Sequence, residues 1–76
     1  KAWIMKLYIF KTSIRNRQKI THAKSLLKKH LSIKNWSVDL EDVDKVMRIE
    51  VTNDILENDI ISMMRNNAFS CEVLSD

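Results

Sequence analysis

The stretch that decides the fold is residues 36–51, WSVDLEDVDKVMRIEV. Apolar and polar side chains alternate from Trp36 to Leu40, and they alternate again from Met47 to Val51. Alternation with a period of two is typical of strands that bury one face. Residues 41–45 turn the chain between the two runs, so the stretch is predicted to form an antiparallel hairpin.

The residues before this hairpin predict a strand and then a helix. Trp3 to Ile14 is rich in aromatic and β-branched side chains, with apolar residues in both alternation phases, which is typical of a strand at the centre of a sheet. From Arg17 to about Leu31 apolar residues recur every three or four positions and line one helical face. These residues are Ile20, Ala23, Leu27 and Leu31.

The residues after the hairpin predict a second helix and a short last strand. Asp54 followed by Glu57 has the spacing of an N-cap and the acidic residue three positions later. Asn66 or Asn67 can end this helix. The apolar face of the helix is Ile60, Ile61, Met63 and Met64, and the alternating apolar residues of the strand are Phe69, Cys71 and Val73.

The turns must form without glycine or proline, because the chain contains neither. Asn and Asp tolerate left-handed backbone better than other non-glycine residues, so they are expected at the turns. The candidate positions are Asn35, Asn53, Asn66 and Asn67.

The predicted element order is β-α-β-β-α-β. Right-handed crossovers turn this order into an α+β ferredoxin-like plait, a four-stranded antiparallel sheet of strand order 4-1-3-2 with two helices on one face. Residues 1–76 are expected to be one domain, since 76 residues support a single core.

The composition excludes several classes of protein. No apolar run approaches the ~20 residues of a spanning helix or the core of a signal peptide, so we expect no membrane association. A lone cysteine, Cys71, cannot form an internal disulfide, which favours a cytoplasmic protein. No carboxylate pair, nucleophile with a base or phosphate-cradling loop is present, so the chain is not expected to be an enzyme.

Charge divides the chain in two. Residues 1–34 carry ten Lys or Arg and no acid, whereas residues 35–76 carry three basic and ten acidic side chains. The net charge is only +3, but this division places a cationic surface on one part of the domain and an anionic surface on another.

The chain resembles the heavy-metal-associated (HMA) domains, the module of copper chaperones and metal-transporting ATPases, over nearly its whole length. The resemblance lies in three segments: residues 10–14 resemble the family's first strand, residues 36–45 its central hairpin, and residues 60–69 its second helix and closing turn. The family's loop carries Met-X-Cys-X-X-Cys before the first helix. Ile14 falls at the Met, Asn16 at the first Cys and Lys19 at the second, so the resemblance implies the fold without the thiolate ligands.

No other metal site is predicted, and no cofactor. Cu(I) needs thiolate or thioether donors close together, and Zn(II) normally takes four donors. Cys71 alternates in phase with Phe69 and Val73, so it is interpreted as a small buried hydrophobe. His22 and His30 are too far apart on the first helix for the i, i+4 pair that chelates a metal.

Two functions remain open. The first is a protein-interaction module that uses the sheet face not covered by helices, and a homodimer is one form of it. The candidate interface is Leu7, Ile9, Lys11, Arg48 and Glu50. The second is binding of an anion or a nucleic-acid backbone by the first helix and its N-terminal loop. Its candidate residues are Arg15, Arg17, Lys19, Lys24 and Lys28. The sheet face not covered by helices is expected to lack aromatic residues on which bases could stack.

Overall fold

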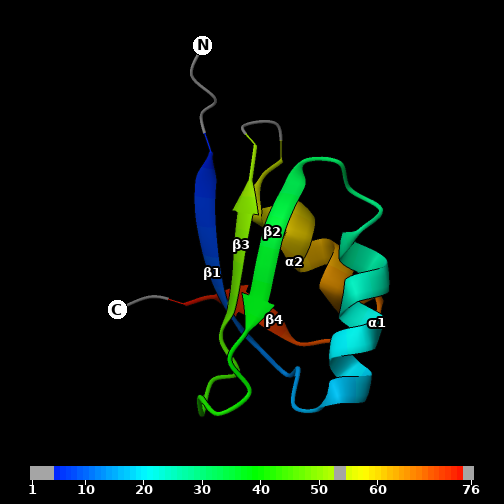
Figure 1. The fold of residues 1–76 in the computed structure, drawn as a ribbon, viewed down its shortest axis with the longest axis vertical. Coiled ribbons are helices and arrows are strands. Elements are labelled where there is room, and N and C mark those ends of the chain that lie inside the picture. Colours follow the sequence, from blue (N-terminus) through cyan, green and yellow to red (C-terminus); the bar gives the residue numbers. More distant parts are fainter. Residues whose placement is uncertain (1–4, 53–54, 75–76) are drawn as a thin grey trace.

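The computed structural model of the chain describes residues 5–52 and 55–74. Its elements follow the predicted order and are shown in Figure 1. They are β1 (Lys6–Thr12), α1 (Arg17–Leu27), β2 (Ile33–Val38), β3 (Met47–Val51), α2 (Glu57–Asn66) and β4 (Cys71–Val73).

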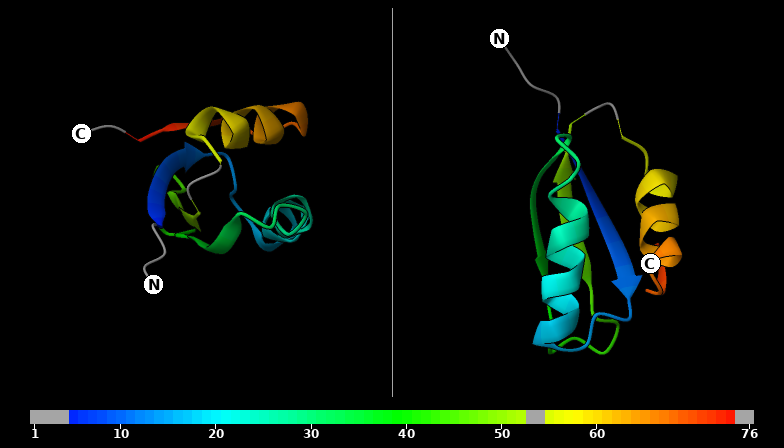
Figure 2. Two further views of the ribbon diagram at one scale, coloured as in Figure 1. Left: turned by 90° about the horizontal axis from the view of Figure 1, so that it is seen from above. Right: turned by 90° about the vertical axis from the view of Figure 1, so that its right-hand side faces the viewer.

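The four strands form one sheet of order β2-β3-β1-β4, in which every neighbouring pair is antiparallel. Both helices pack against the same face of this sheet (Figure 2). The prediction of an α+β ferredoxin-like fold is therefore confirmed, and the other face of the sheet carries no helix.

The core lies between the sheet and the helices. Tyr8, Phe10 and Thr12 point into it from β1. Met47 and Ile49 point into it from β3, as the alternation of residues 47–51 predicts. The apolar residues that α1 and α2 bury against these strands are Ala23, Leu26, Leu27, Ile60 and Met64. Tyr8 also donates a hydrogen bond of 2.7 Å from its hydroxyl to the carbonyl of Ile55, which ties the centre of the sheet to the segment before α2.

The first helix is shorter than predicted, because α1 ends at Leu27 and Leu31 is 89% exposed. The amide of His30 donates to the Leu27 carbonyl, and the amide of Ile33 donates to the His30 carbonyl. These bonds turn the chain into β2, which begins at Ile33 and not at Trp36. The segment that the sequence assigned to the last helical turn is therefore a connection.

The helix α2 begins at Glu57, with Leu56 at the N-cap position. The Leu56 amide donates to the Asp59 carboxylate at 2.9 Å, so an acidic residue at the third helical position satisfies one free amide of the helix start. Glu57 is the first helical residue and does not occupy that third position, and Asp54, the predicted N-cap, lies outside the described residues.

The left-handed backbone positions are not asparagines, contrary to the prediction. Among the described residues, positive φ occurs at Lys45 (47°) and Ala68 (70°). Ala68 follows α2 in a Schellman turn, in which the Phe69 amide donates to the Met64 carbonyl at 3.0 Å and the Ala68 amide to the Arg65 carbonyl at 3.2 Å.

Asn67 contributes to this turn in a different way from the one predicted. It is the C-cap of α2 at φ −113°, and its side-chain amide donates to the Met63 carbonyl at 2.8 Å. Asn66 is the last residue of α2, Asn35 lies within β2, and Asn53 lies outside the described residues. Among the described candidates, Asn67 therefore caps α2, while Lys45 and Ala68 take the left-handed geometry.

Candidate functional site

The loop between β1 and α1, residues 13–16, contains no Cys, His, Asp or Glu. Asn16, which the HMA resemblance places at the first Cys, is the N-cap of α1. Its side-chain oxygen accepts a 2.9 Å hydrogen bond from the amide of Lys19, which the resemblance places at the second Cys. The two residues at the ligand positions thus form an ordinary helix cap. Within residues 5–52 and 55–74, no group of three or more His, Cys, Asp or Glu side chains could hold a metal ion.

Cys71 is far from being a free thiolate. It lies on β4 opposite Thr12, where it is 2% exposed. Burial raises the pKa of the Cys71 thiol to about 11, with the Arg65 charge opposing the shift and the Glu72 charge adding to it. The thiol is therefore protonated at neutral pH, and a soft metal would have to displace the proton and open the core.

The basic residues of the first helix divide between two of its sides. Arg15, Arg17, Lys19, Lys24 and Lys28 are all exposed. Arg17, Lys24 and Lys28 are spaced by about two turns and about one turn, so they follow one side of α1. Lys19 lies elsewhere, with its Nζ 5.9 Å from the centre of the Phe69 ring. The structure therefore brings three of the five candidate anion-binding residues into a row.

An acidic hairpin lies at the same end of the molecule as the β1–α1 loop (Figure 1). The hydroxyl of Thr12 donates to the Lys45 carbonyl at 2.7 Å, and the Thr12 amide donates to the Asp44 carbonyl at 3.1 Å. Lys11 also pairs with Asp44, at 3.8 Å. These contacts hold the carboxylates of residues 39–44 near the loop, where they oppose the approach of an anion.

The predicted interface residues share the uncovered face of the sheet. Leu7 is opposite Glu50 and Ile9 is opposite Arg48, across β1 and β3. Lys11 is opposite Glu72 on β4. Leu7 is 55% exposed and Ile9 half-buried, so an apolar strip runs along β1 between charges of both signs. We call this surface the open face; it consists of the exposed side of β1, β2, β3 and β4.

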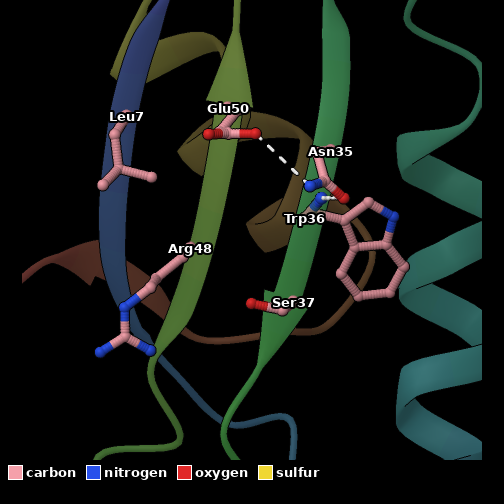
Figure 3. A pocket seen from close by; sticks show the side chains of 6 residues that line it. All are labelled: Leu7, Asn35, Trp36, Ser37, Arg48 and Glu50. Atoms are coloured by element: carbon pink, nitrogen blue, oxygen red, sulfur yellow. Dashed lines mark hydrogen bonds between the residues drawn. The ribbon is translucent and has the colours of Figure 1, made fainter.

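The open face has a shallow depression of about 260 Å³ across β1, β3 and β2, shown in Figure 3. Its lining is Leu7, Asn35, Trp36, Ser37, Arg48 and Glu50. The Asn35 side-chain amide donates to the Glu50 carboxylate at 3.4 Å. Figure 3 shows the guanidinium of Arg48 pointing away from Glu50, and Arg48 makes no ion pair within the part of the chain that the structure describes.

Three lining residues, Asn35, Trp36 and Ser37, are not among the predicted interface residues. Lys34 and Asn35 share a β-bulge opposite Glu50. The bulge places Asn35 on the open face and leaves Trp36 half-buried against the core; Figure 3 shows the Trp36 ring beyond β2, on the side away from β3. The alternation of Trp36 with its neighbours predicted only that Trp36 lies on the core side of the strand.

The edges of the sheet are less available for binding a partner than its open face. The Asp39 amide donates to the Val46 carbonyl. Because hydrogen-bonded and non-hydrogen-bonded residue pairs alternate between antiparallel strands, the Trp36 amide points away from β3. The Asn35 side-chain oxygen accepts from that amide at 3.0 Å. The opposite edge, β4, is three residues long. One edge is thus partly capped and the other is short, both of which hinder pairing with a further strand.

Comparison with known proteins supports the fold. No family model matches the sequence, and no curated protein matches it. Among solved structures, a CsoZ metallochaperone superposes with a TM-score of 0.75 and 7% sequence identity, covering 91% of this chain and 99% of that one. The chain therefore has the fold of a metallochaperone, and at this identity the likeness extends to the fold alone. Among the described residues, no helix has the length and apolar character needed to cross a bilayer.

Proposed function

We propose that this chain is a small non-catalytic protein-interaction domain that retains an HMA-like metallochaperone fold, does not carry a metal, and binds its partner through the open face. The observation that carries the proposal is the exposed apolar strip of Leu7 and Ile9, set between opposite charges on the side of the sheet that has no helix. An apolar centre with a charged rim is the usual anatomy of a protein–protein interface.

The lack of a metal cargo follows from the chemistry of the residues in the loop. Asn16 offers one amide oxygen, which already accepts from the helix, and Lys19 offers no acceptor when charged. Cys71 is on β4, buried and protonated. Cu(I) is selected by soft thiolate or thioether ligands, so this loop does not supply what the ion requires.

A Cu(I) competition titration tests this part of the proposal. The protein, kept reduced, is added to Cu(I) held by a coloured chelator, and the chelator absorbance is followed. The absorbance is expected to stay constant and to be the same with the Cys71→Ala variant. Stoichiometric withdrawal of copper by the wild type, lost in Cys71→Ala, would contradict the proposal.

A comparison of immobilised variants tests the interaction surface. The wild-type chain, Leu7→Asp and Leu31→Asp are used to capture proteins from an extract of the source cells, and captured proteins are then purified and titrated against each variant. Leu31 is a matched control because it is an exposed leucine outside the sheet. We expect a partner whose affinity falls with Leu7→Asp and is unchanged with Leu31→Asp. Partners that bind all three variants equally would show that the open face is not the interface.

A further inference from the structure

We infer that the partner that fits the open face is a second copy of this chain, in an isologous dimer that stacks the two sheets face to face. This inference rests on the proposed function, since it uses the same surface. It follows from the order of side chains in two cross-strand rows at the middle of the open face.

The first row is Leu7, Glu50 and Asn35, and the second row is Ile9, Arg48 and Ser37. Each row crosses β1, β3 and β2 in that order, and the two rows are two residues apart along the strands, or about 7 Å. Figure 3 shows five of these six side chains on the same side of the sheet. Each row therefore contains an apolar, a charged and a neutral polar residue, in the same sequence.

The rows are complementary to each other under a two-fold rotation. If a second copy is turned over about an axis that runs between the rows and parallel to them, its second row faces the first row of this chain. Leu7 then meets the other copy's Ile9, Glu50 meets Arg48, and Asn35 meets Ser37. The same rotation produces the three reciprocal contacts, so one operation matches apolar with apolar, acid with base and amide with hydroxyl. Self-complementarity of this kind is what an isologous interface requires.

The charges on the face are free to make these contacts. Arg48 and Glu50 are both exposed, and neither forms an ion pair within residues 5–52 and 55–74. Among the described residues, the Glu50 carboxylate accepts one hydrogen bond, at 3.4 Å from the Asn35 side-chain amide. A second copy would supply the opposite charge for both residues, twice in each dimer.

The size of the face sets the strength of the association. Three strands of five to seven residues and one of three residues, about 4.8 Å apart and at about 3.3 Å per residue, span roughly 330 Å². A stable interface of ordinary size buries about 800 Å² per partner, and weak reversible ones bury less than about 600 Å². The expected dimer is therefore weak and reversible, with dissociation near the micromolar range or above.

Charge reversal gives a test specific to this pairing. In Arg48→Glu both reciprocal pairs become acid against acid, and in Glu50→Arg both become base against base. Each variant alone is expected to self-associate at least about tenfold more weakly than the wild type, because two pairs change from attraction to repulsion. An equimolar mixture of the two variants restores both pairs, and so does the double variant Arg48→Glu with Glu50→Arg.

The measurement is sedimentation equilibrium of each sample, with native mass spectrometry to identify the mixed dimer by mass. Lys29→Glu is the control, since it changes charge by the same amount at an exposed position just after α1, away from the sheet. The expected result is weakened single variants, restored association in the mixture and in the double variant, and an unchanged control. Circular dichroism confirms that every variant is folded.

Three results would overturn the inference. They are a wild type that remains monomeric up to about 1 mM, a dimer that neither single variant weakens, and single variants that the mixture does not restore. A monomeric wild type would leave the proposed interaction with another protein intact, because the capture experiment with Leu7→Asp and Leu31→Asp tests that separately. If the wild type is monomeric and no captured partner distinguishes Leu7→Asp from Leu31→Asp, the open face is not an interaction surface.

Discussion

Replacing Ala68 by glycine is expected to stabilise the domain. Ala68 has φ 70° in the Schellman turn that ends α2, a position that glycine normally occupies. A residue with a Cβ carries a cost of about 1–2 kcal/mol in left-handed backbone. Glycine loses about 0.5–1 kcal/mol more than alanine in conformational entropy on folding. The difference leaves a gain of about 0.5–1 kcal/mol in the free energy of unfolding of Ala68→Gly.

Thermal and urea unfolding followed by circular dichroism measure this gain. In a domain of this size each kcal/mol moves the midpoint by about 4–8 °C, so Ala68→Gly is expected to raise Tm by roughly 2–8 °C. Ala23→Gly is the opposite control, because Ala23 is buried within α1, where glycine is about 1 kcal/mol less favourable than alanine. Lys45→Gly is expected to gain less than Ala68→Gly, since it also removes the 2.7 Å hydrogen bond from the Lys45 ammonium to the Leu40 carbonyl.

The reasoning would be refuted by one pattern of results. If Ala68→Gly leaves Tm unchanged or lowers it while Ala23→Gly is destabilised as expected, the left-handed backbone at Ala68 is not a source of strain.

Three further predictions concern the core, the thiol and the basic helix. Tyr8→Phe is expected to lower the free energy of unfolding by about 1–2 kcal/mol, because the Ile55 carbonyl loses the Tyr8 hydroxyl in a buried site; an unchanged urea midpoint would contradict this. Because burial raises the pKa of Cys71 from 9.0 to about 11, the unfolded state releases this proton first, so stability falls as pH rises from about 9 to 11. Cys71→Ala should lack that part of the pH dependence, and a wild type with the same pH profile as Cys71→Ala would exclude the thiol as its source. If α1 binds nucleic-acid backbone, fluorescence anisotropy with an oligonucleotide should show affinity that falls with salt and with Lys24→Gln and Lys28→Gln; no binding at low salt would end that alternative.

The order and type of the elements could be predicted because apolar spacing is strong in this sequence. The phase of β3 follows directly from alternation and places Arg48 on the open face. β1 is apolar in both phases, so alternation alone does not decide which face Leu7 takes. The end of α1 could not be predicted in the same way. Leu31 continues the apolar spacing of the helix, but hydrogen bonds of the His30 and Leu27 backbone, which side-chain patterns do not report, turn the chain earlier.

The start of β2 and the cross-strand pairs on the open face depend on the β-bulge at Lys34, which the alternation of side chains does not predict. An unbroken strand would put Ile33 on the same side as Asn35, opposite Trp36. The bulge at Lys34 changes this phase, so Ile33 packs on the core while Asn35 faces outward. Which residue lies opposite Glu50 is therefore set by tertiary pairing, and the two complementary rows became visible only in the structure.

The position of β1 also shapes how the domain folds. β1 comes first among the strands, yet it lies inside the sheet and pairs with β3 and β4, the last two strands in the sequence. Its pairing with β4 joins Phe10 to Val73, so the chain must close a long loop before that contact forms. Non-local pairing of this kind slows folding relative to a helical bundle of equal length. During synthesis β1 therefore emerges well before its partners, and Tyr8 and Phe10 cannot be buried within the sheet until β3 and β4 have left the ribosome.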